Sequence, residues 1–318
     1  MPTPSPSVTV RVPAKVNVQL AVGPPRPDGF HDLANVFLAV GLHDHVTATL
    51  TSPAGPAAPG PAAPGVTVTC TGPGSEHVPL DRSNLAVRAA ELLAARHGIE
   101  PAVRLDIVKD IPVAGGMAGG SADAAGALLA CDTLWGTATP RAELLRLCAE
   151  LGSDVPFSLV GGAALGRGRG ERLTALAVSG PFHWVFALAD GGLSTPEVYR
   201  ECDRLRGDRP VTAPEPDPAL LEALRTGDAP ALAAALANDL QPAAVSLRPS
   251  LAATLAAGMA AGALGGLVSG SGPSCAFLAA DAGSAAKITK SLADSGTCRA
   301  ARATTAPAPG ATTIESYA

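Results

Sequence analysis

The sequence lacks any paired-cysteine motif. Its six cysteines are dispersed along the chain, no two of them form a Cys-x-x-Cys pair, and most lie inside apolar patterns. Such cysteines are typical of small buried side chains in a reducing compartment, not of disulfides or metal sites. The histidines other than His31 have no spacing that indicates a metal cage. We therefore expect a cytoplasmic protein without a metal site built from its own side chains.

The sequence also lacks an excess of positive charge. With Lys+Arg 23 against Asp+Glu 28, the formal net charge is −5 at pH 7, which disfavours a nucleic-acid backbone as the main partner. The N-terminus has no basic region followed by an apolar one, so no signal peptide is expected. Residues 251–268 run apolar for the length of a membrane span, but they are mostly alanine and glycine. Leu251, Leu255 and Met259 recur as on the buried stripe of a soluble helix, so no membrane partner is expected.

What is present is a chain of globular length and composition. The 318 residues, 47% of them apolar, are enough for two domains. Alternating or β-branched runs predict strands at 8–12, 16–22, 45–51 and 103–108, and apolar periodicity predicts helices at 120–135 and 140–151 and a third capped by Ser83. The Pro/Ala/Gly repetition at 52–65 is expected to be a mobile loop. The mixed order predicts an α+β fold, not a regular doubly wound sheet.

A glycine-rich segment joins the predicted strand at 103–108 to the predicted helix at 120–135. The stretch Pro112–Ala122, PVAGGMAGGSA, places four glycines just before a helix start. Free backbone N–H groups and the positive end of a helix dipole are suited to holding phosphate. The chain has no GxxxxGK[ST] motif and no GxGxxG with an acidic residue about twenty positions on, so P-loop enzymes and nucleotide dehydrogenases are disfavoured. Taken alone, the segment fits a phosphate site and a tight turn equally well.

Two further segments place polar side chains where chemistry is expected. In PAKVNVQL, Lys15 and Asn17 alternate along a strand, so both side chains point to one face. In LGSDVPFSL, Asp154 follows a helix end and precedes an apolar run, where a carboxylate needs a partner. A lysine and an aspartate are more often an ordinary surface pair, and only the surrounding motifs favour a functional role.

The motifs PAKVN…RPDGFH, NLA, PVAGGMAGGSADAA, GSDVPF and SGSGP occur in this order, and the ordered set resembles the GHMP small-molecule kinases. It is most similar to the branch that uses ATP to phosphorylate the 2-hydroxyl of diphosphocytidyl methylerythritol, in the methylerythritol phosphate route to isoprenoids. The resemblance extends from Pro13 to about Phe277. It implies a two-domain α+β fold, divided into 1–162 and 163–318, with the active site in the cleft between the domains and with ATP and Mg²⁺ as cofactors.

The resemblance also implies roles for individual residues. Lys15 and Asp154 are expected to be the catalytic pair. The residues expected around ATP are Asn84, Leu85 and Lys109 at the adenine, and Pro112, Val113, Ala114, Gly115, Gly116, Met117, Ala118, Gly119, Gly120, Ser121 and Ala122 at the phosphates. Within that loop, Ser121 is expected to contact phosphate or Mg²⁺. The residues expected to bind the acceptor substrate are Asn17, Phe30, His31, Thr195, Tyr199, Ser269, Gly270, Ser271 and Gly272, with the rings of Phe30 and Tyr199 on either side of the cytosine.

The phosphate loop departs from the usual run of the family. Ala114 and Ala118 stand at glycine positions, Met117 at a leucine position and Ala122 at a serine position. Added methyl groups restrict φ but leave the N–H donors in place, so backbone binding of phosphate is still expected. Phe30 stands where tyrosine is common, which removes a hydroxyl and keeps the ring.

Phosphoryl transfer to an alcohol depends on alignment and charge stabilisation more than on a strong base. We therefore expect Asp154 to orient the acceptor hydroxyl and take its proton, while Lys15 positions that carboxylate and offsets charge near the γ-phosphoryl. Two alternatives stay open: a GHMP kinase for homoserine, mevalonate or a sugar, and a non-catalytic nucleotide-binding or RNA-binding protein of the same fold. The oligomeric state, monomer or homodimer, is also open.

Overall fold

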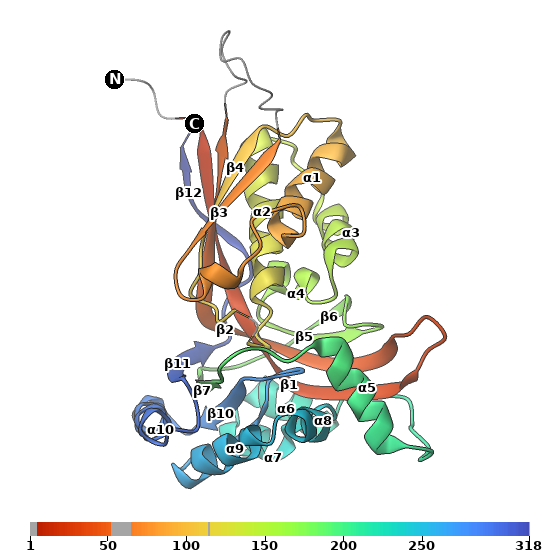
Figure 1. The fold of residues 1–318 in the computed structure, drawn as a ribbon, viewed down its shortest axis with the longest axis vertical. Coiled ribbons are helices and arrows are strands. Elements are labelled where there is room, and N and C mark those ends of the chain that lie inside the picture. Colours follow the sequence, from red (N-terminus) through yellow and green to blue (C-terminus); the bar gives the residue numbers. More distant parts are fainter. Residues whose placement is uncertain (1–4, 52–64, 114, 318) are drawn as a thin grey trace.

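The chain is described by a computed structural model over residues 5–51, 65–113 and 115–317, so the loop predicted at 52–65 lies almost entirely outside the described residues. The fold is α+β, as the sequence predicts, with two sheets and helices packed on them (Figure 1). The strands are β1 (Ser7–Pro25), β2 (His31–Leu50), β3 (Val66–Thr71), β4 (Val103–Val108), β5 (Ala163–Arg167), β6 (Arg172–Leu176), β7 (Phe182–Leu188), β8 (Ala237–Asn238), β9 (Gly265–Val268), β10 (Cys275–Ala279), β11 (Ala300–Ala306) and β12 (Thr312–Tyr317). The helices are α1 (Leu85–His97), α2 (Gly119–Trp135), α3 (Arg141–Leu151), α4 (Val155–Val160), α5 (Thr195–Arg206), α6 (Pro218–Thr226), α7 (Ala229–Ala235), α8 (Gln241–Leu247), α9 (Ser250–Ala260) and α10 (Ala282–Asp294).

A long hairpin, β1 and β2, dominates the first sheet. The two strands pair antiparallel from Ser7 opposite Thr49 to Pro25 opposite His31. The strands predicted separately at 8–12 and 16–22 are therefore one strand. The pairing register shifts between Pro13 and Ala14, and such a bulge bends a strand and increases its twist without ending it.

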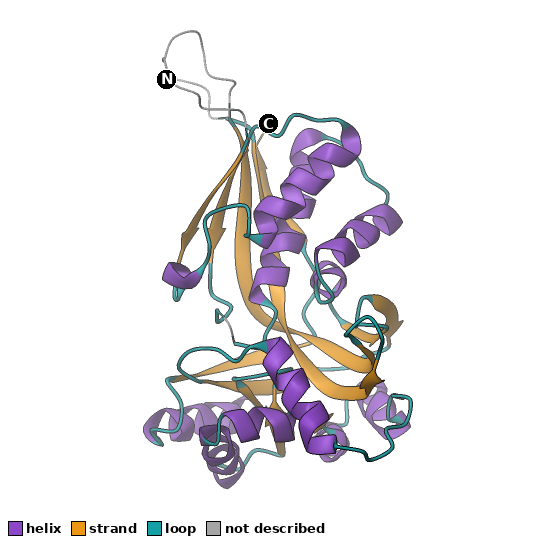
Figure 2. Cartoon of the chain, turned by 45° about the vertical axis from the view of Figure 1, so that its right-hand side comes forward, coloured by secondary structure: helices purple, strands orange, loops and turns teal. Residues whose placement is uncertain are grey.

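The first sheet has the strand order β12-β1-β2-β4-β3, with β5, β6 and β8 joined beside it, and the second has the order β11-β7-β10-β9. Helices α1 and α3 pack on α2, which packs on the hairpin, so that these helices lie on one side of the first sheet (Figure 2). Strands β5, β6 and β12 lie beyond the predicted boundary at residue 162 and still pair within the first sheet. The sheets therefore do not divide at that residue, and the two-domain boundary stays a prediction.

The two sheets share a hydrophobic core. One cluster of buried side chains contains Val16 and Leu38 of the hairpin together with Trp184 and Phe186 of β7. The second cluster lies between the second sheet and helices α5, α8, α9 and α10. Side chains of both sheets therefore exclude water from one continuous interior, which fixes the hairpin relative to β7.

Two helix predictions are settled by the structure. Helix α1 is capped by Asn84, whose side-chain oxygen accepts the Ala86 N–H at 2.8 Å; the prediction of Ser83 was wrong, because its hydroxyl donates to Asp81 instead. The apolar run at 251–268 divides into α9 and the buried strand β9, as its glycines indicate. Within the part of the chain that the structure describes, no helix is both long and apolar enough to cross a bilayer.

Candidate active site

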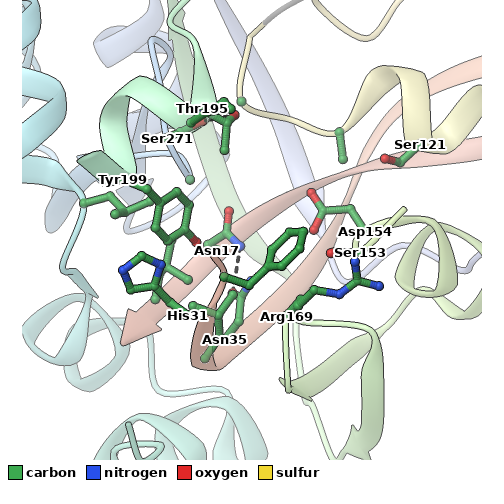
Figure 3. A pocket seen from close by; sticks show the side chains of 18 of the residues that line it. Asn17, His31, Asn35, Ser121, Ser153, Asp154, Arg169, Thr195, Tyr199 and Ser271 are labelled. Atoms are coloured by element: carbon green, nitrogen blue, oxygen red, sulfur yellow. Dashed lines mark hydrogen bonds between the residues drawn. The ribbon is translucent and has the colours of Figure 1, made fainter. Parts of the chain in front are cut away.

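A cavity of about 770 Å³ lies where the β1–β2 hairpin, the glycine-rich loop before α2 and helix α5 meet (Figure 3). At one end, which we call the α5 end, are His31 and Tyr199; at the other, the loop end, are Ser121 and Asp154. The predicted site residues that line it are Lys15, Asn17, Phe30, His31, Gly115, Gly116, Ala118, Gly119, Gly120, Ser121, Asp154, Thr195, Tyr199, Gly270 and Ser271. The fold thus brings together residues from four of the five ordered motifs, with Thr195 and Tyr199 of α5 added to them.

Lys15 and Asp154 face each other at the loop end. The Lys15 Nζ lies 3.6 Å from the Asp154 Oδ2, with the lysine side chain 6% exposed and the aspartate side chain 32% exposed. Asp154 is the N-cap residue of α4, yet its side chain accepts no capping hydrogen bond. The carboxylate therefore stays available to a group in the cavity, and it has a fixed ammonium beside it.

Lys15 is held in place by a short chain of polar contacts. Its Nζ donates to the Asn17 Oδ1 at 2.6 Å and to the Gly116 carbonyl at 3.2 Å. The Asn17 Nδ2 in turn donates to the Asn35 Oδ1 at 2.7 Å. Lys15 and Asn17 share one face of β1, as their alternation predicts, and Asn35 comes from β2. The buried lysine is thus oriented toward the cavity by both strands of the hairpin and by the loop.

The glycine-rich loop delivers the N-terminus of α2 to the cavity. Ala118 is the N-cap residue with φ 61, a left-handed conformation that costs an alanine about 1–2 kcal/mol. Gly119 and Gly120 follow as the first helical residues, and the N–H groups of a first helical turn have no partner within the helix. These donors and the helix dipole are suited to holding an anion, which is what the sequence of the loop predicts.

Gly116 is the point where this loop contacts the turn before β10. Its carbonyl accepts hydrogen bonds from the Ser269 hydroxyl at 3.0 Å and from Lys15. Its φ is +71°, and a Cβ added there would lie 2.4 Å from the Ser269 carbonyl oxygen and 2.9 Å from that of Gly272. No larger residue fits without moving one of the two segments.

Gly116→Ala is expected to raise the KM for ATP by about 5–150-fold, because strain and displacement of about 1–3 kcal/mol fall directly on the loop. Steady-state kinetics with varied ATP measures this. Gly98→Ala is the matched control, since Gly98 also has a positive φ of 64° but nothing within 4 Å of an added Cβ. Equal KM values for the two variants would contradict the role of the close approach.

Helix α5 lines the opposite wall with Thr195, Tyr199 and Asp203, which are four residues apart and share one face. The Thr195 hydroxyl is 2.9 Å from that of Ser271, which joins the start of α5 to the turn before β10. Burial, reinforced by the nearby Asp154 carboxylate, raises the pKa of Tyr199. Its ring lies against His31, with centroids 5.0 Å apart.

Phe30 is an exposed aromatic side chain at the tip of the hairpin, 47% accessible. The Arg169 guanidinium, from the turn between β5 and β6, lies over its ring with the central carbon 4.9 Å from the centroid. A cation over an aromatic face at this distance is favourable. Arg169 therefore brings a positive charge to the cavity wall beside this aromatic ring.

Lys109 does not line the cavity. It is 3% exposed, and its Nζ donates to the Asp44 Oδ2 at 2.5 Å and to the Asp123 Oδ2 at 2.6 Å. Burial by itself lowers the pKa of Lys109, but the two carboxylates outweigh it and the pKa is raised; burial raises the pKa of Asp123 to about 7. Asp44 also accepts the N–H groups of Asp110 and Ile111. The side chain thus ties the start of the loop to β2 and α2 and is not free to contact a base.

Other predicted site residues also do not line the cavity. Asn84 uses its side chain for the α1 cap and for the Pro79 carbonyl. Those that do not line the cavity are Asn84, Leu85, Lys109, Pro112, Val113, Met117, Ala122, Ser269 and Gly272. Met117, Ala122 and Ser269 are fully buried and support the loop from beneath. Ala114 lies outside the described residues.

The cavity also contains residues that the sequence analysis did not single out, including Asn35, Ser153, Arg169, Arg200 and Asp203. Ser153 immediately precedes Asp154. Asp203 lies four residues after Tyr199, so helical spacing was a signal that could have found it. Arg169 belongs to a Gly-Arg-Gly-Arg-Gly turn with no predicted function, and only the folded chain brings it to Phe30.

Among the residues that the structure describes, no group of three His, Cys, Asp or Glu side chains is arranged to hold a metal ion. The loop end nevertheless offers the Ser121 hydroxyl and the Asp154 carboxylate. Mg²⁺ in phosphate sites characteristically takes one or two protein oxygens and completes its coordination with phosphate and water. The loop end therefore fits an ion that arrives with a nucleotide.

A helix N-terminus with a Lys–Asp pair beside it is an arrangement suited to phosphoryl transfer to a small molecule, which is the class of protein that the site indicates. Two family models match the chain: "GHMP kinases N terminal domain" at residues 84–162 and "GHMP kinases C terminal" at residues 220–297. A relative from Streptomyces avermitilis, 4-diphosphocytidyl-2-C-methyl-D-erythritol kinase, is 68% identical over 97% of this chain and 100% of its own length. The chain belongs to the GHMP kinase family, among the 4-diphosphocytidyl-2-C-methyl-D-erythritol kinases.

Solved structures agree on the fold. A crystal structure of 4-(cytidine 5'-diphospho)-2C-methyl-D-erythritol kinase has a TM-score of 0.73 and 33% identity, and the match covers 93% of this chain and 98% of that one. A homoserine kinase from Cytophaga hutchinsonii also has a TM-score of 0.73, with 20% identity and 97% of each chain covered. Because the backbone is shared equally well, the fold alone does not separate these acceptors.

Proposed function

We propose that this protein transfers the γ-phosphoryl group of ATP to the 2-hydroxyl of 4-diphosphocytidyl-2-C-methyl-D-erythritol, releasing ADP and the 2-phosphate. The observation that carries the proposal is the Lys15–Asp154 pair, 3.6 Å apart, beside the N-terminus of α2 in a cavity that also holds His31 and Tyr199. The 68% identity to a relative of that name supports this acceptor. The reaction is a step of the methylerythritol phosphate route to isoprenoids.

ATP is placed with its phosphates at the loop end, against the backbone from Gly115 to Ser121. The first-turn N–H groups of α2 and its dipole offset phosphate charge. Mg²⁺, held by the ATP phosphates with Ser121, supplies further charge neutralisation when bound. The adenine is placed near Asn84, Leu85 and the backbone of Lys109, whose side chain is taken up by Asp44 and Asp123.

Asp154 is placed as the residue that orients the acceptor hydroxyl and takes its proton as the new P–O bond forms. A carboxylate suffices, because in a loose transition state the proton leaves late. Lys15 holds the carboxylate in position and offsets charge on the transferred phosphoryl group. The contacts from Asn17 and Gly116 keep the ammonium in place before substrate arrives.

The acceptor is placed with its cytosine at the α5 end. Aromatic rings at Phe30 and Tyr199 suit a nucleobase, for which stacking is worth about 1–3 kcal/mol per base. Homoserine, mevalonate and sugars have no such ring. We place Thr195, Gly270 and Ser271, which all line the cavity, along the middle of the acceptor.

ADP release is expected only with 4-diphosphocytidyl-2-C-methyl-D-erythritol when homoserine, mevalonate and galactose are offered beside it with ATP and Mg²⁺. A coupled ADP assay measures each rate. Turnover of one of the other acceptors alone would support kinase activity but contradict the proposed acceptor substrate. ATP binding without turnover of any acceptor would favour a non-catalytic nucleotide-binding protein.

The proposed cellular compartment is the cytoplasm, which the six free cysteines support.

A further inference from the structure

The strongest unassigned feature of the cavity is the contact between His31 and Asp203. The His31 Nε2 lies 3.0 and 3.1 Å from the two carboxylate oxygens of Asp203. The His31 side chain is 6% exposed, while the aspartate side chain is 34% exposed. The pair joins the tip of the hairpin to α5 across 172 residues of sequence, and both members line the cavity.

Asp203 lies among arginines but pairs with none of them. On the same helix, Arg204 binds Glu201 and Arg206 binds Asp239. Arg200 lies closest to Glu197, at 3.9 Å. Across the described part of the chain, the hydrogen bonds and ion pairs of the Asp203 carboxylate all go to His31. The contact is therefore not one of the surface ion pairs that cover the rest of α5.

The contact decides which imidazole nitrogen carries the proton. An ionised carboxylate only accepts hydrogen bonds, so the Nε2 of His31 must be the donor. In the neutral ring the proton is then on Nε2, and the Nδ1 presents a lone pair. Among the described residues, the hydrogen bonds of the His31 ring are all made at Nε2, so none of them occupies the Nδ1. Because His31 lines the cavity, a ligand there can pair with that lone pair.

A lone pair at Nδ1 distinguishes the two pyrimidines found in nucleoside diphosphates. Cytosine has an amino group at C4, which donates to such a lone pair. Uracil has a carbonyl oxygen there, and two acceptors facing each other repel. A polar site that is built to pair with one group rejects the analogue strongly, because its own buried atom is left unpaired.

We propose that Asp203 is a positioning residue that holds His31 in the tautomer protonated at Nε2 and thereby makes the cavity select cytosine over uracil in the acceptor. The inference rests on the proposed function for the acceptor class. Asp203 would then affect specificity without touching the base, because it acts by orienting the proton of His31.

Asp203→Ala tests the proposal with two acceptors, the cytidine compound and its uridine analogue, 4-diphosphouridyl-2-C-methyl-D-erythritol. The ratio of their kcat/KM values is expected to fall by at least ~10-fold, mainly through a higher KM for the cytidine acceptor, while the KM for ATP stays unchanged. In Asp203→Asn the cytidine-to-uridine ratio of kcat/KM is expected to lie between those of the wild-type protein and Asp203→Ala. The reason is that an amide can present either its oxygen or its NH₂ group to Nε2. Glu197→Ala, an exposed carboxylate on the same helix, is the matched control.

A second measurement does not depend on turnover. The ¹⁵N chemical shifts of the His31 imidazole are expected to report one Nε2–H tautomer in the wild-type protein and a mixture in Asp203→Ala. An unchanged cytidine-to-uridine ratio in Asp203→Ala, or equal use of both acceptors by the wild-type protein, would overturn the selection. A wild-type protein that phosphorylates neither acceptor would instead overturn the proposed function, and the ¹⁵N shifts would still decide whether Asp203 sets the tautomer.

Discussion

Asp154→Asn is expected to lower kcat by about 10²–10⁴-fold, the usual contribution of a positioned proton acceptor. The amide keeps the size of the side chain and its place at the start of α4, but it has no charge and takes no proton from the acceptor hydroxyl. Because Lys15 then loses its anionic partner, the ammonium is also less well directed toward the transferred phosphoryl group. Single-turnover kinetics with saturating ATP measures the chemical step.

Binding of ATP separates this role from a structural one. The dissociation constant for ATP is expected to change little in Asp154→Asn, because the phosphates are proposed to bind backbone groups of the loop. Asp190→Asn, whose side chain is 81% exposed, is the control with the same change of atoms and charge. A near wild-type kcat in Asp154→Asn would remove Asp154 from the chemistry.

Lys109→Met is expected to lower the free energy of unfolding by about 3–5 kcal/mol, the largest loss of stability among the substitutions proposed for this protein. The substitution leaves the carboxylates of Asp44 and Asp123 together in the interior without their shared cation. Asp123 is already poorly satisfied, since its Oδ1 has no hydrogen-bond partner. Urea unfolding followed by circular dichroism measures the change.

Lys290→Met is the matched control, because the Lys290 side chain is 81% exposed and pairs with Asp294 one helical turn away. It is expected to unfold at the wild-type urea concentration. The triple substitution Lys109→Met, Asp44→Asn, Asp123→Asn is expected to recover part of the loss, since no unpaired charge then remains buried. Recovery of none of it would show that packing, not charge, is what Lys109 provides.

The sequence predicts the loop end of the site better than its surroundings. The phosphate loop depends on local features: a strand, a run of glycines and a helix start that follow one another in sequence. Lys15 and Asn17 needed only strand alternation to be placed on one face. The position of the predicted cap was wrong by one residue because Ser83 and Asn84 are both good caps, and Asp81 captures the first of them.

Contacts across long stretches of sequence are what could not be predicted. One of the two carboxylates that pair with Lys109 belongs to Asp44, 65 residues away, and nothing in the local sequence around either residue indicates the pair. The contact of Arg169 with Phe30 arises only when the β5–β6 turn folds against the hairpin. Strand β12 returns to the first sheet beside β1, which the predicted division at residue 162 did not anticipate.

The β1–β2 hairpin carries residues from both ends of the cavity on one pair of strands. His31 begins β2 at the tip, and Lys15 lies on β1 opposite Ala39, further along the same ladder. In the proposed binding mode, the span from the base to the transferred phosphoryl group is therefore set by hydrogen-bonded strand geometry, not by the relative position of two moving bodies. The hairpin therefore selects the length of the acceptor. A shorter acceptor that binds its base at the tip leaves its hydroxyl out of reach of Lys15 and Asp154.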